Sequence, residues 1–387
     1  MRNTIIIFLL AGFISCIEQN NNITNPPVGP GSQQPAILTT DYGMVLSWME
    51  PIDGDIHLRF STFNGVIWSD PINIAQGSNW FVNWADFPAL ISNGDKLFAH
   101  FMQISGESTY DYDIMYTVSS DRGATWLPPR KLHADTIKGE HGFLSGSAFE
   151  DGFVVSWLDG RYTKTENGAM SIRGAVINGA GEVTRAMEID NRTCDCCQTT
   201  LTNVGGKPMV FYRDRSENEV RDIYYSALLD SGWIEPQVLH DDNWEINACP
   251  VNGPVTLSND DHVAVGWFTG AEANYEVKLK ISADSGESFG EVILVDGPDA
   301  FGRLDIEIDE EHIYLTYLTR KELKASLMLA VYNMAGELVE KKSMATINPD
   351  RGTGFPRITA WSGRLVIAWT DLELNQVNLL AYSISGD

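Results

Sequence analysis

Phe153-Val154-Val155-Ser156-Trp157 is a short apolar segment that ends on an aromatic residue. Six further segments share this design: Met44–Trp48, Leu97–Phe101, Pro208–Tyr212, Val263–Trp267, Ile313–Tyr317 and Leu365–Trp369. The terminal aromatic residues follow one another at intervals of 53, 56, 55, 55, 50 and 52 residues. A strand-only repeat of this length indicates an all-β fold, the β-propeller, in which each sheet buries its faces against its neighbours in a ring.

Each repeat predicts one four-stranded blade, so the sequence predicts seven blades, with six as the alternative count. An alternating segment such as Ile172–Val176 follows each aromatic-ended one and is typical of a third strand. The last repeat ends at Asp387, after its third strand. We expect residues near Ile23–Val28 to supply the missing fourth strand and to close the ring, because an unpaired edge invites aggregation.

The N-terminus predicts an exported protein. Arg2 precedes an apolar run at residues 5–14, which is too short to span a bilayer and is typical of a secretory signal. The run ends in Phe13-Ile14-Ser15-Cys16, which resembles a bacterial lipobox and implies lipidation of Cys16. A plain signal peptide with an incidental Cys is the alternative. We therefore expect a signal at residues 1–16, a flexible tether at 17–33 and the propeller at 34–387, anchored in the cell envelope with its lipid as the only membrane contact.

The formal net charge of −25 excludes a nucleic-acid partner, because phosphates would be repelled. An anionic small ligand requires arginines gathered in one cleft.

Two turns carry a second motif, S-x-D-x-G-x-[ST] followed by an aromatic residue. These turns are Ser119–Trp126 and Ser282–Phe289. The Asp carboxylate can accept N–H groups of the turn, Gly allows a left-handed residue, and the aromatic residue packs beneath. We expect both turns to be structural.

Two such Asp-boxes at this spacing resemble those of sialidase-like BNR-repeat propellers, from about Gln34 onward. The chain also resembles a group of secreted bacterial proteins of this kind in stretches that include Trp157-Leu158-Asp159-Gly160-Arg161 and Cys194-Asp195-Cys196-Cys197. The resemblance implies a site in which three arginines hold a sugar carboxylate, a Tyr activated by a Glu attacks, and an Asp donates a proton. However, the sequence has no Arg-Ile-Pro motif near the start of the repeats, and it does not indicate which Tyr pairs with a Glu.

In a propeller the loops between second and third strands share one end with the connections between blades, and the Asp-box turns lie at the other end. The polar and aromatic loops of this chain fall on the first end, where we expect the functional site. The candidate acids and base are Asp86, Asp159 and Glu140, and the candidate substrate-binding residues are Arg161, Arg213, Arg221, Arg303, Arg357, Trp80 and Asn83. The alternative is that the arginines brace loops through nearby carboxylates, as in Arg213-Asp214 and Arg221-Asp222.

Four cysteines remain beside Cys16: Cys194, Cys196, Cys197 and Cys249. In an exported protein an even number of Cys favours disulfides, and four Cys allow three pairings. A bond between Cys196 and Cys197 would be strained, so we expect Cys249 to join one member of the cluster. The alternatives are a copper or zinc site, with His141 or His240 as an additional ligand, and redox-active thiols.

The sequence thus predicts an exported sialidase-like protein that acts on or binds an anionic glycan. A metal or thiol-redox protein centred on the cysteines, and a scaffold that binds a partner protein through its loops, are the two alternatives.

Overall fold

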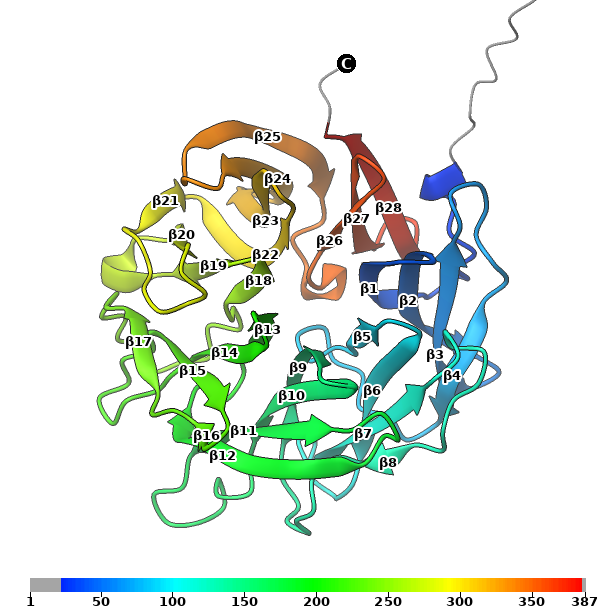
Figure 1. The fold of residues 1–387 in the computed structure, drawn as a ribbon, viewed down its shortest axis with the longest axis horizontal. Helices are drawn as coiled ribbons and strands as arrows, with labels where there is room; N and C mark the ends of the chain where they lie inside the picture. Colours follow the sequence, from blue (N-terminus) through cyan, green and yellow to red (C-terminus); the bar gives the residue numbers. More distant parts are fainter. Residues whose placement is uncertain (1–21, 385–387) are drawn as a thin grey trace, which may run out of the picture.

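The computed structural model describes residues 22–384 and shows seven antiparallel sheets arranged as a ring (Figure 1). Seven blades are therefore confirmed. Blade 1 contains β1 (Gln33–Thr40), β2 (Gly43–Ile52), β3 (Asp55–Phe63) and β4 (Ile72–Gly77). Blade 2 contains β5 (Leu90–Asn93), β6 (Lys96–Ile104), β7 (Tyr112–Ser119) and β8 (Arg130–Lys131). Blade 3 contains β9 (His141–Phe149), β10 (Gly152–Asp159), β11 (Met170–Ile177) and β12 (Val183–Thr193).

Blades 4 to 7 follow in the same order. Blade 4 contains β13 (Thr200–Val204), β14 (Lys207–Arg213), β15 (Ile223–Leu229), β16 (Gly232–Trp233) and β17 (Gln237–His240), and blade 5 contains β18 (Val255–Asn259), β19 (His262–Thr269), β20 (Glu276–Ser282) and β21 (Ile293–Asp296). Blade 6 contains β22 (Ala300–Ile308), β23 (His312–Lys321), β24 (Lys324–Asn333) and β25 (Leu338–Ile347). Blade 7 contains β26 (Arg357–Trp361), β27 (Arg364–Asp371) and β28 (Gln376–Ser383). Each blade is a meander whose strands pair in chain order, except that in blade 4 both β16 and β17 pair with β15.

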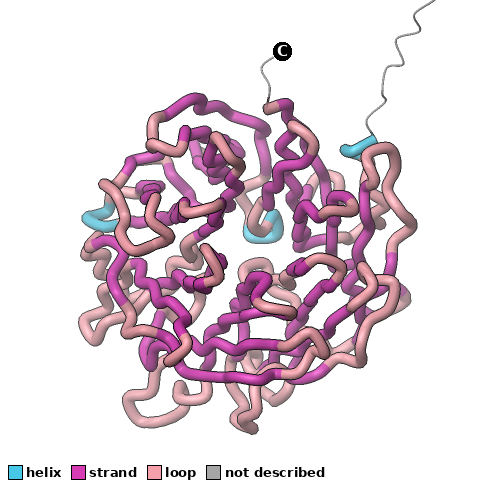
Figure 2. The backbone as a smooth tube through the Cα atoms, viewed as in Figure 1, coloured by secondary structure: helices cyan, strands magenta, loops and turns pink. Residues whose placement is uncertain are grey.

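Helical structure in residues 22–384 is limited to three 3₁₀ turns, η1 (Asn22–Thr24), η2 (Ala271–Ala273) and η3 (Arg351–Thr353) (Figure 2). None of the helical segments in this range is long and apolar enough to cross a membrane.

The aromatic residues that mark the repeat lie in the second strands and are buried between neighbouring blades. Trp157 at the end of β10, for example, packs with Phe98 and Phe153 between blades 2 and 3. Several of these rings also carry a polar atom that reaches a carboxylate: the Trp157 indole donates to Asp159 across 2.9 Å, and the Tyr212 hydroxyl donates to Asp190 across 2.7 Å. Some of the acidic residues at this end of the propeller therefore hold core aromatic side chains in place.

The Asp-box turns have the predicted structural role. Asp121 Oδ1 accepts from the Thr125 N–H across 2.8 Å, and its Oδ2 accepts from the Thr125 hydroxyl across 2.7 Å. Gly123 has φ +85°, and a Cβ there would meet the ring of Phe60. The box at Ser282–Phe289 repeats these contacts through Asp284 and Ser288.

The ring closes differently from the prediction. Blade 7 has only three strands within the described residues, so the expected fourth strand from residues 23–28 is wrong. Ile23 instead is buried against Val366 and Val377 of blade 7. The Gly31 N–H donates to the Asn375 carbonyl across 2.7 Å, and the Val377 N–H donates to the Ser32 hydroxyl across 2.9 Å. Apolar packing and these bonds cover the edge without a ladder. Residues 22–33, part of the expected tether, lie against the propeller, whereas Cys16 lies outside the described residues.

We call the end of the ring that carries the loops between second and third strands and the connections between blades the loop face. The Gly160 N–H donates to the Glu140 carbonyl across 2.7 Å, and the Arg221 N–H donates to the Trp244 carbonyl across 2.9 Å, so loops and connections do meet there. The first strands of all seven blades line a central channel of about 530 Å³, and Asp86 and Phe355 lie among its lining residues.

Candidate functional site on the loop face

Tyr112 lies between two carboxyl groups that come from different blades. Its hydroxyl is 2.8 Å from Asp86 Oδ2 and 2.9 Å from Glu140 Oε1. Tyr112 opens β7, Asp86 precedes β5, and Glu140 directly precedes β9. The ring of Phe81 stacks on Tyr112 with centroids 4.1 Å apart and holds the phenol in place. The structure thus supplies the Tyr with a Glu partner that the sequence alone did not reveal.

This arrangement needs an additional proton. A phenol has one hydrogen, so it can donate to only one carboxylate, and the second contact requires a proton on the other carboxyl group. Burial raises the pKa of Asp86 to about 7, and burial together with the nearby charges of Asp86 and Asp195 raises the pKa of Glu140 to about 8. Burial and the two carboxylates raise the pKa of Tyr112 well above its usual value. At neutral pH the Glu140 carboxyl therefore suits an acid better than the base predicted from the sequence.

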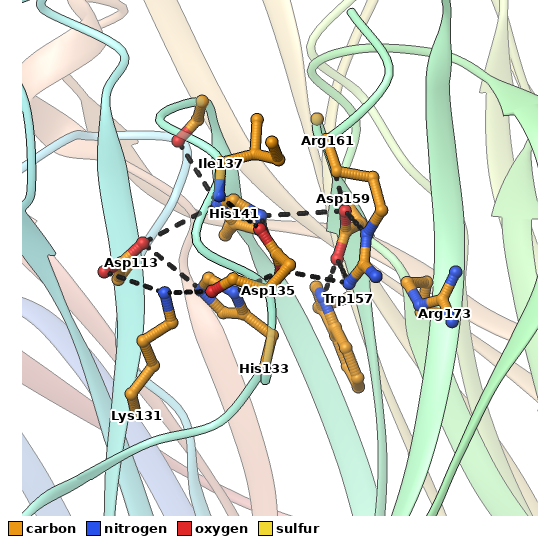
Figure 3. Close-up of polar contacts among 12 residues, drawn as sticks. Asp113, Lys131, His133, Asp135, Ile137, His141, Trp157, Asp159, Arg161 and Arg173 are labelled. Carbon is orange, nitrogen blue, oxygen red and sulfur yellow. Dashed lines mark hydrogen bonds and ion pairs between the residues drawn. The ribbon is translucent and has the colours of Figure 1, made fainter.

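Asp159, predicted as an acid, is held by several donors. Arg161 donates from Nε to Oδ1 across 2.7 Å and from Nη2 to Oδ2 across 2.8 Å, and the Trp157 indole also donates to Oδ2 (Figure 3). Burial alone would raise the pKa of Asp159, but the hydrogen bond from Arg161 and the nearby His141 outweigh it and lower the pKa to about 2. Asp159 is thus ionised at neutral pH, and its partner Arg161 is not free for a ligand.

His141 lies in the same cluster and not with the cysteines. Its Nδ1 is 3.3 Å from the Tyr112 carbonyl oxygen and 3.2 Å from that of Gly139, so Nδ1 carries the proton. Its buried Nε2 has no hydrogen-bond partner among residues 22–384 and faces Asp135 Oδ2 at 3.5 Å and Asp159 Oδ1 at 3.6 Å. One His and two carboxylates could in principle hold a metal ion.

The donor atoms of this cluster fit a metal poorly. Asp159 Oδ1 already accepts from Arg161 Nε, and Asp135 Oδ2 lies 2.7 Å from His133 Nδ1 and 3.1 Å from Arg161 Nη2 (Figure 3). A divalent ion at His141 would stand beside a guanidinium and compete with it for the same oxygen atoms. The cluster therefore neutralises itself, and its role is to brace the connection between blades 2 and 3.

Three more of the predicted arginines have structural partners. Arg213 is buried and donates to main-chain carbonyls, Arg221 donates to Glu219 across 2.7 Å, and Arg357 lies 3.2 Å from Asp305. Within residues 22–384 neither Arg213 nor Arg221 forms an ion pair with the Asp that follows it. These contacts agree with the alternative that the arginines brace loops, although the partners differ from those predicted.

Trp80 and Asn83 are also used by the fold. Trp80 is buried and stacks on Phe101 with centroids 4.0 Å apart. Asn83 Oδ1 accepts from the Ala85 N–H across 2.9 Å and so stabilises its own turn. The Trp80 ring is therefore part of the core, and the Asn83 side chain contributes to its own turn through Oδ1.

Arg357 lies among the residues that line the central channel, and Arg303 lines a separate cleft together with two arginines that the prediction omitted. We call this cleft, of about 560 Å³, the arginine cleft; its walls include Trp84, Phe301, Arg303, Arg320 and Arg351. The Arg303 and Arg351 guanidinium groups lie 5.0 and 5.7 Å from the Trp84 ring centroid, and Arg320 lies 5.5 Å from that of Phe301.

The protein offsets only part of the charge of the arginine cleft, because Asp350 is the one carboxylate among its lining residues. In the part of the chain that the structure describes, no carboxylate lies within ion-pair distance of Arg303, Arg320 or Arg351. Arg303 donates instead to the carbonyls of Asp350 and Gly354. Burial, reinforced by Arg351 and Arg320, outweighs the nearby charge of Asp350 and lowers the pKa of Arg303 to about 10, so that Arg303 keeps its charge at neutral pH. Three guanidinium groups that form no ion pair, beside a single carboxylate, in a protein of net charge −25 give this cleft a local excess of positive charge that suits an anion.

The four cysteines form one sulfur cluster beside this cleft. Cys196 and Cys249 form a disulfide with their Cα atoms 6.0 Å apart. Cys249 thus joins one member of the cysteine cluster, as the sequence predicted. Cys194 and Cys197 are free, buried and 3.3 Å apart at sulfur. With Cys196 and Cys249 bonded, two thiols remain, and Arg221 already donates to Cys194, so the cluster does not fit the predicted copper or zinc site.

Comparison with known proteins agrees with this fold. The BNR repeat-like domain matches residues 52–367. The chain belongs to this family. The resemblance to sialidase-like BNR propellers that the Asp-boxes predicted is thus confirmed, and the family assignment covers all seven blades at least in part. A search of curated protein sequences found no match.

Solved structures similar to this BNR propeller include several carbohydrate-active proteins. A PL25 ulvan lyase bound to -[GlcA(1-4)Rha3S]- has a TM-score of 0.55 and 11% identity over 94% of each chain. An α-L-arabinanase of Penicillium chrysogenum has a TM-score of 0.49 and 15% identity over 92% of this chain and 97% of its own. The NanB sialidase of Streptococcus pneumoniae has a TM-score of 0.42 and 14% identity over 90% and 67%. At such identities the likeness shows the fold alone.

Proposed function

We propose that this BNR propeller binds an anionic carbohydrate in the arginine cleft. The observation that carries the proposal is the group of three guanidinium groups without carboxylate partners beside a half-buried Trp. A guanidinium presents paired N–H donors that match a carboxylate or a sulfate. An aromatic wall supplies apolar contact for a sugar ring, and the cleft volume is that of an ordinary small-molecule site.

The exposed position of two of the three arginines favours a ligand that places its anionic group at the mouth of the arginine cleft. Arg320 and Arg351 are exposed, whereas Arg303 is buried and holds the loop at η3 through main-chain carbonyls. Arg320 and Arg351 are therefore the residues that would contact the anionic group, and Arg303 would contribute its charge. The ulvan lyase with a similar fold is bound to an anionic repeat, but the ligand class proposed here depends on the arginines of this chain.

Titration calorimetry with sulfated, carboxylated and neutral oligosaccharides of equal length tests this proposal. Binding of the charged ligands, weakened by salt and by Arg320→Gln or Arg351→Gln, would support it. Arg122→Gln is the matched control, because Arg122 is also exposed but pairs with Asp95 in an Asp-box turn on the opposite end of the propeller. Equal affinity for the neutral oligosaccharide, or equal losses in the control, would refute it.

A second candidate function, hydrolysis of the bound glycan, is favoured by the group of Asp86, Tyr112 and Glu140. The two carboxyl oxygens are no more than 5.7 Å apart, since they lie 2.8 and 2.9 Å from one hydroxyl. Retaining glycosidases place their carboxyl groups about 5–5.5 Å apart. Glu140 is only half-buried, so it is the member of the group that a substrate could reach, and at neutral pH it has a proton to donate.

Turnover of a chromogenic glycoside of the bound sugar would test this second candidate. Glu140→Gln should abolish turnover and leave affinity in the arginine cleft intact, because Glu140 does not line that cleft. A propeller that binds the glycan but shows no turnover with any such substrate would be a binding protein only.

We also propose that the protein is exported and held at the cell envelope by a lipid on Cys16. The support is the signal-like sequence at residues 2–16. Metabolic labelling with a fatty acid, lost in the Cys16→Ser variant, tests this assignment.

A further inference from the structure

The four sulfur atoms differ in their access to solvent. Cys194 and Cys197 are 0% and 2% exposed, whereas Cys249 is exposed and forms part of the wall of the arginine cleft. Cys196 lies between them, bonded to Cys249, with its sulfur within 4.8 Å of those of Cys194 and Cys197. A buried dithiol is thus in close contact with a disulfide whose outer end is at the surface.

Cys194 has the environment of a reactive thiolate. Arg221 Nη1 lies 3.2 Å from its sulfur, and the Cys197 thiol lies 3.3 Å from it on another side. The hydrogen bond from Cys197 and the charge of Arg221 lower the pKa of Cys194, while burial and the Cys194 sulfur raise the pKa of Cys197. Within this pair Cys194 is the nucleophile and Cys197 retains the proton.

We propose that the four cysteines form a thiol–disulfide exchange centre that transfers the disulfide between the surface pair Cys196–Cys249 and the buried pair Cys194–Cys197. The Cys194 thiolate attacks the Cys196 sulfur, a Cys194–Cys196 bond forms, and the bond to Cys249 breaks and releases the Cys249 thiolate. Cys197 then attacks Cys194, the Cys194–Cys196 bond breaks, and Cys196 leaves as a thiolate that takes up the proton of Cys197.

This exchange conserves one disulfide and two thiols, so it needs no external oxidant or reductant. It converts the Cys196–Cys249 disulfide into two thiols, of which Cys249 lies at the wall of the arginine cleft and can react there with a thiol-reactive molecule or with an exported disulfide. The inference is independent of the proposed glycan ligand, because it depends only on the positions of the sulfur atoms and Arg221.

Peptide mapping after alkylation tests the centre. The full chain with Cys16→Ser is treated under native conditions with N-ethylmaleimide, quenched in acid and digested without reduction. Exchange predicts maleimide on Cys249 and Cys196 together with a Cys194–Cys197 disulfide, because alkylation traps the surface thiols. A disulfide that stays at Cys196–Cys249, with maleimide confined to Cys194 and Cys197, would overturn the proposal. Two disulfides and no reactive thiol would also overturn it.

Two variants show whether Cys194 drives the reaction. Cys194→Ser should abolish labelling of Cys249, because Cys197 alone would have to form a strained bond with its neighbour Cys196. Arg221→Lys should keep a positive charge near the sulfur but lose the fixed guanidinium, and should move the pH dependence of Cys249 labelling to higher pH. Continued labelling of Cys249 in Cys194→Ser would refute the mechanism. Circular dichroism confirms that each variant is folded, and the result for the parent chain is decisive by itself.

Discussion

The Tyr112 hydroxyl lies 2.9 Å from Glu140 Oε1, and these residues come from adjacent blades. The contact joins the start of the third strand of blade 2 to the connection that enters blade 3, and the same hydroxyl also meets Asp86. It therefore links three loop-face segments through a single phenol.

Tyr112→Phe should destabilise the protein by about 1–3 kcal/mol, because it leaves the buried Asp86 carboxyl group and the half-buried Glu140 carboxyl group without their shared partner. Chemical unfolding at pH 7 measures this loss. Tyr110→Phe is the control, since Tyr110 is exposed and its ring only contacts Phe81. Equal effects of the two changes would mean that the shared hydrogen bonds contribute nothing.

Stability should fall as pH rises from 5 to 9. The folded-state pKa values of Asp86 and Glu140, about 7 and about 8, exceed the unfolded values of 3.8 and 4.5. The folded state thus binds more protons, and the stability that these groups contribute is present below the unfolded values and is lost as pH rises through 7 and 8.

Asp86→Asn should reduce the loss of unfolding free energy across this pH range by a few kcal/mol. Each unit by which the folded-state pKa of Asp86 exceeds its unfolded value contributes on the order of 1.4 kcal/mol. Thermal unfolding across the pH range measures it, with the exposed Glu310→Gln as control. If the parent and Asp86→Asn proteins lose stability in parallel, the carboxyl group of Asp86 is not protonated in the folded state.

Arg351→Gln should weaken binding of an anionic oligosaccharide about tenfold, which corresponds to about 1.4 kcal/mol. Arg351→Lys keeps the charge but loses the paired donors, and it should retain an intermediate affinity. Calorimetry at two salt concentrations separates the two contributions, because the charge contribution is screened and the geometric one is not. An affinity of Arg351→Lys equal to that of the parent chain would assign Arg351 a purely electrostatic role, whereas identical affinities of the two variants would show that its charge contributes nothing.

Gly123→Ala should cost several times more stability than Gly94→Ala. Both glycines have positive φ, +85° and +58°, so both changes incur roughly 1–2 kcal/mol of backbone strain. In addition, the new methyl group at residue 123 would meet the Phe60 ring, whereas nothing lies within 4 Å of one at residue 94. Urea unfolding measures the free energy of unfolding of both variants, and the difference between their losses is the steric contribution at residue 123. Equal losses in the two variants would mean that this steric contribution is absent.

Much of the fold could be predicted because its determinants are local. A blade strand and an Asp-box each lie within ten residues, so Trp157 and Asp121 could be assigned from their neighbours in the sequence. The exposed edge of blade 7 was predicted incorrectly in detail, because Ile23 covers it by packing, which has no periodic pattern.

The candidate site was less predictable. Arg161 and Arg303 look equivalent in the sequence, yet Arg161 is engaged by Asp159 and Arg303 faces the cleft. Arg320 ends a strand and belongs to no motif, so only its position against Phe301 reveals it. Tyr112 and Glu140 are 28 residues apart, and nothing local pairs them.

The amino-acid sequence by itself determined the propeller, its seven blades, its Asp-box turns and the end where polar loops gather, because these follow from short-range hydrophobic patterning and turn chemistry. Only the tertiary structure decided which side chains are free to act. Whether an arginine, carboxylate or thiol binds a ligand or holds a loop depends on which partners the neighbouring blade brings within about 3 Å, the reach of a hydrogen bond. That choice depends on the closure of the whole ring.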